Sequence, residues 1–302
     1  MLPSLFMLFI LIVLPIVTIW MLARATYKTK LEWLLDAVKT VALVAWLVHT
    51  QPWDWIGYYI RYLLVILLVV ALFLSWKKVN ALPFREKYTT KRTNTMGLNI
   101  VLIVFFGAIT VSSIFSYSVK DKAIELAFPM HEGTYYVGHG GNHTSMNYHH
   151  AYDDQKYALD IVKLNKIGTR ANGLQPKDLT KYAIFGDELL SPCNGKVIEA
   201  RDGLQDMTPP EMDPEHPEGN YVALQCEQHE ATIYLVHMKE GSVAVAKGDT
   251  VTTGQLLGKV GNSGNTSEPH LHIHAELDGK GVPLTFDGRF LVRNQLVKAG
   301  GK

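Results

Sequence analysis

Residues 245–276 read VAKGDTVTTGQLLGKVGNSGNTSEPHLHIHAE, and three of the last seven are histidines spaced two positions apart. Successive side chains of a β-strand alternate between its two faces, so His270, His272 and His274 point to one face if this stretch is a strand. Imidazoles about 7 Å apart on one face can serve a single site, where one binds a metal and its neighbour handles a proton. The glycine-rich turn before Pro269 favours such a site over isolated surface histidines.

The same kind of pattern extends through the second part of the chain. Short runs of alternating apolar and polar residues, separated by Gly, Asn, Asp and Pro turns, predict an all-β body. These runs lie at 196–200, 221–225, 232–236 and 271–275. Residues 163–182 are polar and have room for a short helix, whereas the acidic, proline-rich residues 202–219 predict a surface loop.

The formal net charge of +1 over 302 residues conceals two oppositely charged parts. Residues 1–118 hold 11 Lys and Arg against 4 Asp and Glu, whereas residues 119–302 hold 18 against 24, so the net charges are +7 and −6. The chain therefore lacks the basic excess of a nucleic-acid-binding protein, and its hydrophobic content of 48% excludes disorder. We expect a transmembrane region at 1–118, a linker at 119–134 and an extracytoplasmic domain at 135–302.

Apolar segments in the first part predict about four transmembrane helices, each long enough to cross a hydrocarbon core of about 30 Å. They lie at 3–22, 31–49, 56–76 and 99–118. Asp36 and Lys39 interrupt the first turns of the segment 31–49, so an interfacial amphipathic helix is the alternative there. Lys39 is close enough to one end to snorkel, and we therefore expect this segment to span.

Basic residues in the connections set the predicted orientation. The first and third connections hold nine Lys and Arg, whereas the second, HTQPWDW, holds none. By the positive-inside rule the basic connections are cytoplasmic, so both termini lie outside and membrane lipid is a partner. A cleaved signal peptide is the alternative for 3–22, but no basic residue precedes this apolar run. We expect a multi-pass protein of the cell membrane with an extracytoplasmic C-terminal domain.

Eleven of the twelve histidines lie after residue 118, so the second domain contains many candidate metal ligands. The helix-borne HExxH zinc motif is absent, because neither His131-Glu132 nor His229-Glu230 is followed by the second histidine. The two cysteines, Cys193 and Cys226, are not in a paired ligand motif. They form either a disulfide, which an external compartment permits, or two reduced buried thiols.

The run 245–276 resembles the C-terminal signature of the lysostaphin/LytM-type zinc endopeptidases, which joins a G-D-x-V-x-x-G-Q turn, a glycine-rich loop and a P-H-L-H strand. Upstream segments resemble other parts of that family in the same order; they are Ser191–Val197, Gly219–Val222 and Tyr234–His237. The resemblance covers about 145–280. It implies an all-β peptidase domain with a small antiparallel β-sandwich or sheet core, and it implies bound Zn²⁺.

The resemblance also implies roles for individual residues. His272, the second histidine of H-L-H, corresponds to a zinc ligand, and Asp160 to the aspartate ligand. His270 and His237 correspond to the two catalytic histidines. Such a site has three protein ligands and an open fourth position, as catalytic zinc sites do. His274 lies one step farther along the same face, where we expect a supporting or exposed position rather than ligation.

The remaining ligand departs from the common H-x-x-x-D pattern, because position 156 is Lys. The ligand then comes from His149 or His150, before an inserted turn, and only one of the two faces the metal if the strand alternates. We favour His149 and leave His150 as the alternative. His139 and His143, in a Gly-rich stretch, are expected in a loop, and a position lining the cleft is the alternative.

The implied function is hydrolysis of peptide bonds in peptidoglycan outside the cytoplasmic membrane. Two alternatives keep the family: a catalytically inactive wall-binding or regulatory relative, and a zinc peptidase that acts on a secreted peptide. A lipoyl- or biotinyl-like carrier is a third, but a carrier has no use for these histidines. The sequence does not identify the peptide bond that is cleaved, the oligomeric state, or a role of the membrane region beyond anchoring.

Overall fold

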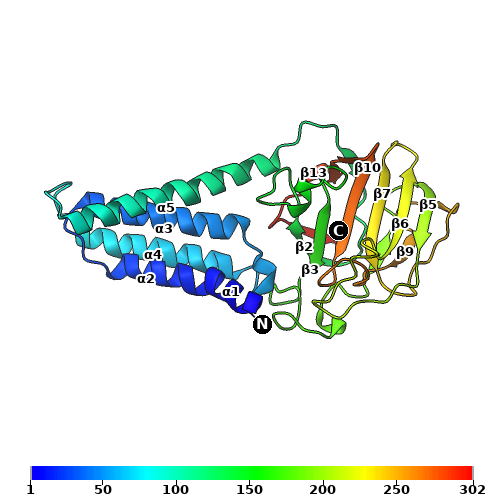
Figure 1. Ribbon diagram of the computed structural model, residues 1–302, viewed down its shortest axis with the longest axis horizontal. Coiled ribbons are helices and arrows are strands. Elements are labelled where there is room, and N and C mark those ends of the chain that lie inside the picture. The colour runs from blue at the N-terminus through cyan, green and yellow to red at the C-terminus, as the bar shows by residue number, and fades with distance from the viewer. Residues whose placement is uncertain (1, 301–302) are drawn as a thin grey trace. The chain divides into compact units, whose positions relative to one another are not determined.

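The first part of the chain is helical in a computed structural model that describes residues 2–300. Its contacts separate Met1–Ile114 from a second unit, Phe115–Lys302. In the first unit, helices α2 to α5 run alongside one another (Figure 1). The helical elements are α1 (Leu2–Leu8), the π-helical turn η1 (Phe9–Val13), α2 (Leu14–Arg24), α3 (Lys30–Thr50), the 3₁₀ turn η2 (Trp53–Trp55), α4 (Ile60–Val79) and α5 (Thr90–Ile114).

Three helical segments of the described residues are long and apolar enough to cross a membrane: Leu5–Arg24, Ile60–Val79 and Thr90–Tyr117. Helix α4 leaves large apolar side chains such as Ile66 and Phe73 more than half exposed. The segment predicted as a fourth span forms helix α3, but α3 is not among these three. Acidic and basic residues in its first half lower its apolar character.

The charged start of α3 is used in packing. Thr29 caps the helix by accepting a hydrogen bond from the backbone N–H of Glu32 at 3.2 Å. Glu32 in turn accepts from Lys28 N–H at 2.8 Å and from the Arg92 guanidinium of α5 at 2.5 and 2.7 Å. These contacts tie α3 to α5 within the first unit.

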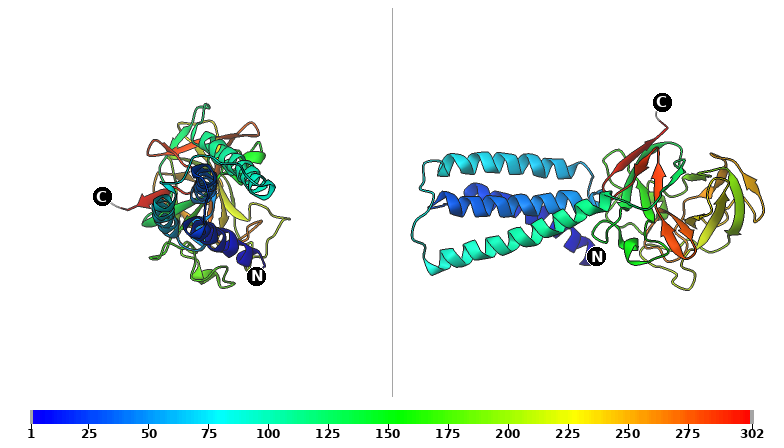
Figure 2. Two further views of the ribbon diagram at one scale, coloured as in Figure 1. Left: turned by 90° about the vertical axis from the view of Figure 1, so that its left-hand side faces the viewer. Right: turned by 90° about the horizontal axis from the view of Figure 1, so that it is seen from above.

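The second unit is built around a nine-stranded antiparallel sheet in the order β14-β2-β3-β10-β7-β6-β5-β8, with β11 added to β10. The central strands lie side by side in Figures 1 and 2. Its strands are β2 (Gly133–His139), β3 (Leu159–Lys163), β5 (Gly195–Arg201), β6 (Asn220–Cys226), β7 (Thr232–Met238), β8 (Thr250–Val251), β10 (Leu271–Leu277), β11 (Lys280–Val282) and β14 (Leu296–Ala299). All four predicted strand runs are confirmed, in β5, β6, β7 and β10.

Two smaller sheets accompany the large one. Strands β4 (Glu188–Leu190) and β9 (Leu256–Lys259) form an antiparallel pair. Strand β1 (Ile124–Leu126) pairs in parallel with β12 (Leu284–Phe286), which pairs with β13 (Arg289–Phe290). The segment 119–134, expected as a linker, therefore contributes a strand, because Ile124 and Leu126 alternate with an exposed residue and are buried.

Alternation along the strands creates the core of the second unit. One face of the sheet buries residues such as Ile161, Leu235, Leu271 and Ile273, each at most 1% exposed. The intervening residues of β3 and β10, Asp160 and His272 among them, belong to the other face. The segment 202–219 contains no strand or helix, as predicted for an acidic surface loop.

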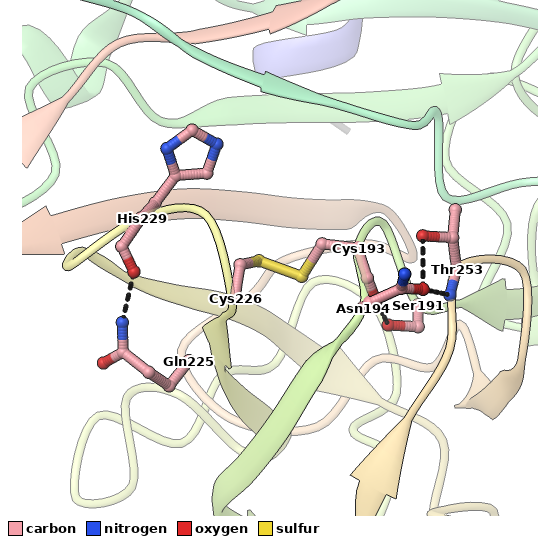
Figure 3. The surroundings of a disulfide bond; sticks show 7 residues. All are labelled: Ser191, Cys193, Asn194, Gln225, Cys226, His229 and Thr253. Carbon is pink, nitrogen blue, oxygen red and sulfur yellow. Dashed lines mark hydrogen bonds between the residues drawn. A yellow bond between two sulfur atoms is a disulfide. The ribbon is translucent and has the colours of Figure 1, made fainter.

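Cys193 and Cys226 form a disulfide that joins the turn before β5 to the end of β6 (Figure 3). This resolves the two alternatives left open by the sequence in favour of the oxidised pair. On the next residue of the same turn, Asn194 accepts a hydrogen bond from Thr253 N–H at 2.8 Å. The disulfide and this hydrogen bond therefore both hold the turn before β5, at the end of the sheet opposite β14.

Candidate active site

The candidate site lies on three adjacent strands of the large sheet. Strand β10 occupies the position between β3 and β7, and its residue His272 is directly opposite Asp160 on one side and Val236 on the other. Because directly opposed residues of an antiparallel pair share a face, these side chains lie on the same side of the sheet. The arrangement joins residues more than 110 positions apart in the sequence.

Asp160 is the centre of the cluster. Its Oδ2 lies 2.9 Å from Nε2 of His149, which is carried by the 3₁₀ turn η4 (Tyr148–Ala151). Its Oδ1 lies 2.9 Å from Nδ1 of His272 and 3.4 Å from Nε2 of His270. One carboxylate thus contacts three imidazoles from two separate segments of the chain.

His237 reaches the site through a β-bulge. The pairing of β6 with β7 shifts register between Asn220 and Val222, so β7 has one extra residue there. His237 has a φ of 60°, in the left-handed region that a non-glycine residue rarely adopts. Simple alternation from Val236 sends residue 237 to the opposite face, whereas the bulge places its ring 5.0 Å from that of His270.

Backbone carbonyls fix the ring nitrogens of both predicted catalytic histidines. His237 Nδ1 donates to the carbonyl of Ser263 at 2.9 Å, and His270 Nδ1 donates to that of Glu268 at 2.9 Å. A carbonyl oxygen only accepts, so Nδ1 carries the proton in each ring. The Nε2 of each ring is then the nitrogen that can exchange a proton with a ligand.

His274 is buried and contacts His272. The two residues form a hydrogen bond between His272 Nε2 and His274 Nδ1 at 3.1 Å. The His274 ring stacks on Tyr234, which is directly opposite on β7, with ring centroids 4.8 Å apart and an interplanar angle of 11°. The sequence placed this histidine on the correct face, and the structure shows that it is buried rather than exposed.

The acid–base properties of the cluster follow from burial and from mutual charge. Burial alone raises the pKa of Asp160, but the neighbouring His149 and His270 outweigh it and hold that pKa well below its ordinary value. Burial lowers the pKa of His270, but the Asp160 carboxylate outweighs it and raises that pKa. Burial, together with the neighbouring histidines, holds the pKa of His237 well below its ordinary value.

An open cleft of about 310 Å³ gives access to the cluster. Four of the site's histidines and neighbours from two loops line it. The lining residues are Tyr148, His149, Tyr152, Asp154, Gln155, Pro217, Glu218, Val236, His237, Asn265, His272 and His274. The acidic loop 202–219 therefore forms one wall of the cleft through its last residues.

All five predicted site residues meet in one place: His149, Asp160, His237, His270 and His272. His150, the alternative to His149, instead packs against the ring of Tyr157, with centroids 6.3 Å apart. His139 was expected in a loop but ends β2, directly opposite Asp160, where it accepts a hydrogen bond from Tyr148 N–H at 3.1 Å.

Sequence reasoning did not identify Arg170 and Glu268, which form an ion pair beside His270. The negative charge next to Pro269 was the available signal, but its partner lies 98 positions earlier. Tyr234, which stacks on His274, was also not identified. The period of two shared by β7 and β10 was the signal that places it opposite.

The donor set fits a metal ion. Two groups bring ligand atoms within 4.8 Å of one another: His149, Asp160 and His272, and the overlapping group His237, His270 and His272. The first combines two imidazole nitrogens with a carboxylate oxygen, a donor set typical of catalytic zinc. The three residues come from η4, β3 and β10, so the fold rather than a local motif assembles them.

Comparison with known proteins supports a peptidase. Residues 179–284 match the model of peptidase family M23, a range that includes His237, His270 and His272. The chain is 27% identical over 176 residues to the peptidoglycan DD-endopeptidase ShyA of Vibrio cholerae. That similarity covers 57% of this chain and 37% of the relative, so the chain spans little more than a third of that protein's length.

Solved structures with similarity to the chain include a zinc-containing peptidase from Vibrio cholerae, at 24% identity and a TM-score of 0.24 over 40% of this chain and 28% of that one. Another is the catalytic domain of lysostaphin from Staphylococcus simulans, at 20% identity and a TM-score of 0.24 over 35% and 79%. The family match therefore identifies a domain of peptidase family M23, a family of metallopeptidases, over residues 179–284 of the second unit.

Proposed function

We propose that this protein is a zinc metalloendopeptidase that hydrolyses peptide bonds in peptidoglycan outside the cytoplasmic membrane. His149, Asp160 and His272 hold the zinc ion, and His237 and His270 act on the reacting groups. The observation that carries the proposal is the contact of one carboxylate, Asp160, with nitrogens of His149 and His272 at 2.9 Å each.

The overlapping trio His237, His270 and His272 is the weaker candidate for the ligand set. It contains no anionic donor, whereas Asp160 offers a negative charge to the cation. His237 and His270 are also held by their Nδ1 atoms to the carbonyls of Ser263 and Glu268. That geometry suits side chains that move protons.

Bound zinc supplies Lewis acidity, which polarises a peptide carbonyl and makes water a better nucleophile near neutral pH. The chain supplies the proton transfers. His237 presents an Nε2 without a proton, because its Nδ1 carries the proton and its pKa is lowered, so this ring can take the proton that the attacking water loses. His270, whose pKa the Asp160 carboxylate raises, presents a protonated Nε2 that stabilises the developing oxyanion and protonates the leaving amine. The two roles can be exchanged between these rings without altering the ligand set.

The peptidoglycan substrate is supported by the matched relative, whose name describes a peptidoglycan DD-endopeptidase. The location is supported by the three apolar helical segments and by the basic residues that flank them. The disulfide agrees with a domain outside the reducing cytoplasm.

Digestion of purified cell wall tests the substrate. The full chain in detergent micelles, loaded with Zn²⁺, is expected to release muropeptides with new amino termini, which mass spectrometry identifies together with the bond cleaved. Zinc bound at one equivalent without any new amino terminus is the result expected of an inactive relative. Cleavage of secreted peptides but not of wall indicates the other alternative. Either result contradicts the proposal.

Protease treatment of intact protoplasts tests the orientation. We expect the second unit, Phe115–Lys302, to be digested while the helical region stays protected by the membrane. Protection of the second unit in intact protoplasts, with digestion only after lysis, contradicts an extracytoplasmic domain.

A further inference from the structure

His272 uses both of its ring nitrogens. Nδ1 faces Asp160 Oδ1 at 2.9 Å, and Nε2 faces Nδ1 of His274 at 3.1 Å. A histidine that binds a metal through one nitrogen carries its proton on the other, and that N–H needs an acceptor. The His272 side chain is only 3% exposed, so water is not at hand as the acceptor. The group that faces its Nε2 is a second imidazole, that of His274.

We propose that His274 is a positioning residue for the zinc site: its Nδ1 accepts the Nε2–H of His272 and thereby holds His272 with Nδ1 free for the metal. This inference rests on the proposed assignment of His272 as a ligand. It gives His274 a task that neither ligation nor contact with the substrate requires.

The orientation of the His274 ring is fixed from the neighbouring strand. Its stacking on Tyr234, nearly parallel at 11°, sets the plane of the imidazole. The side chain is 6% exposed, so water competes little for its Nδ1. Two residues apart on β10, His272 and His274 share a face, and the strand itself keeps their nitrogens at hydrogen-bond distance.

A metal bound at Nδ1 of His272 would determine a tautomer for each ring. His272 Nδ1 then gives its lone pair to the metal, and Nε2 carries the proton and donates it to His274 Nδ1. His274 accepts at Nδ1, so it must be neutral with its proton on Nε2.

Two substitutions separate the acceptor from the packing. His274→Phe keeps an aromatic ring against Tyr234 but removes the acceptor. His274→Gln removes the ring but keeps an acceptor in its amide oxygen. Zinc affinity is measured on the full chain in detergent micelles by competition with a chromogenic chelator. His131→Phe, an exchange at an exposed histidine outside the site, is the control.

We expect His274→Phe to weaken zinc binding about 10- to 100-fold, the usual effect of losing a partner of a metal-bound histidine. We expect His274→Gln and the control to stay within about threefold of the parent. Unchanged affinity in His274→Phe overturns the inference, as does an equal loss in both variants. A parent chain that binds no zinc instead overturns the proposed ligand set.

Nitrogen NMR of histidine-labelled, zinc-loaded parent protein provides a test that needs no variant to fold. We expect His272 to show a metal-bound Nδ1 and a protonated Nε2. Coordination through Nε2, or a protonated Nδ1 on His274, overturns the inference.

Discussion

Arg170 donates two hydrogen bonds to the carboxylate of Glu268, from Nε to Oε1 at 2.8 Å and from Nη2 to Oε2 at 2.7 Å. Arg170 is 1% exposed, and Glu268 lies just before strand β10. The backbone carbonyl of Glu268 accepts hydrogen bonds from His270 Nδ1 and from Thr266 Oγ1. The ion pair therefore holds the peptide unit that fixes the proton of His270.

Replacing Arg170 by Met is expected to lower catalysis while zinc content stays unchanged. The substitution leaves Glu268 without its buried partner, which costs about 2–3 kcal/mol of folding stability because Glu268 keeps some contact with water. His270 then loses its fixed carbonyl, so kcat falls more than KM changes. Thermal unfolding, bound zinc and steady-state kinetics on one substrate measure the three effects.

Lys163→Met is the matched control for this prediction. Lys163 pairs with Asp187 at 2.9 Å in the same domain, but its side chain is 26% exposed. We expect the free energy of unfolding to fall by less than about 1 kcal/mol and kcat to stay unchanged. An equal fall of kcat in both variants would falsify the positioning role of Arg170.

Alanine substitutions at the adjacent histidines 149 and 150 distinguish the two candidate ligands. His149→Ala is expected to abolish zinc retention and hydrolysis, as is His272→Ala, because each removes a nitrogen that contacts Asp160. His150→Ala is expected to retain both, since that ring packs on Tyr157. Elemental analysis of the purified variants measures the bound zinc. Zinc loss on substituting 150 alone reverses the assignment.

Asn in place of His237 tests a catalytic residue without disturbing the bulge. Asn tolerates the left-handed conformation that this position requires, whereas Ala adds backbone strain there. We expect wild-type zinc content and a drop in kcat of about 10²- to 10⁴-fold, the usual contribution of a general acid or base. Single-turnover hydrolysis is the appropriate measurement. A variant that loses its zinc would place His237 among the ligands.

Removing the disulfide by the double substitution Cys193→Ser and Cys226→Ser tests its contribution to stability. The bridge spans 33 positions, and a loop of that length predicts a loss of about 3–4 kcal/mol. The bridge joins the turn before β5 to the end of β6, outside the histidine cluster. Zinc affinity of the folded protein at low temperature should therefore be unchanged. Comparing thermal unfolding of the parent with and without reductant gives the same difference; an insensitive midpoint contradicts the prediction.

Sequence patterns predicted the strands well because one face of each strand is apolar and buried while the other carries polar side chains. Leu271 and Ile273 alternate with histidines, and β10 has that period in the structure. The segment 119–134 was harder, because Ile124 and Leu126 are too few to indicate a strand without their partner β12. Helix α3 was predicted as a span from its length, but its charged first half belongs to contacts within the bundle.

The sequence predicted those site residues that belong to a local motif. It did not predict those that only the fold brings into contact with the site. His270 and His272 stand in a recognisable signature, and Asp160 lies opposite them in register. The burial of His274 depends on Tyr234, which comes from another strand. Arg170 could not be associated with Glu268 from the sequence, because only the fold brings such distant positions together.

The bulge at His237 has a consequence for loop exchange between related enzymes. The backbone of His237 donates to the carbonyl of Glu218 at 3.0 Å and accepts from Gly261 N–H at 3.0 Å. A histidine needed for chemistry is thus fastened to the end of the acidic loop 202–219. Replacing that loop with the loop of a related enzyme removes the hydrogen bond to Glu218. An exchange made to change substrate preference therefore also changes the position of the His237 ring.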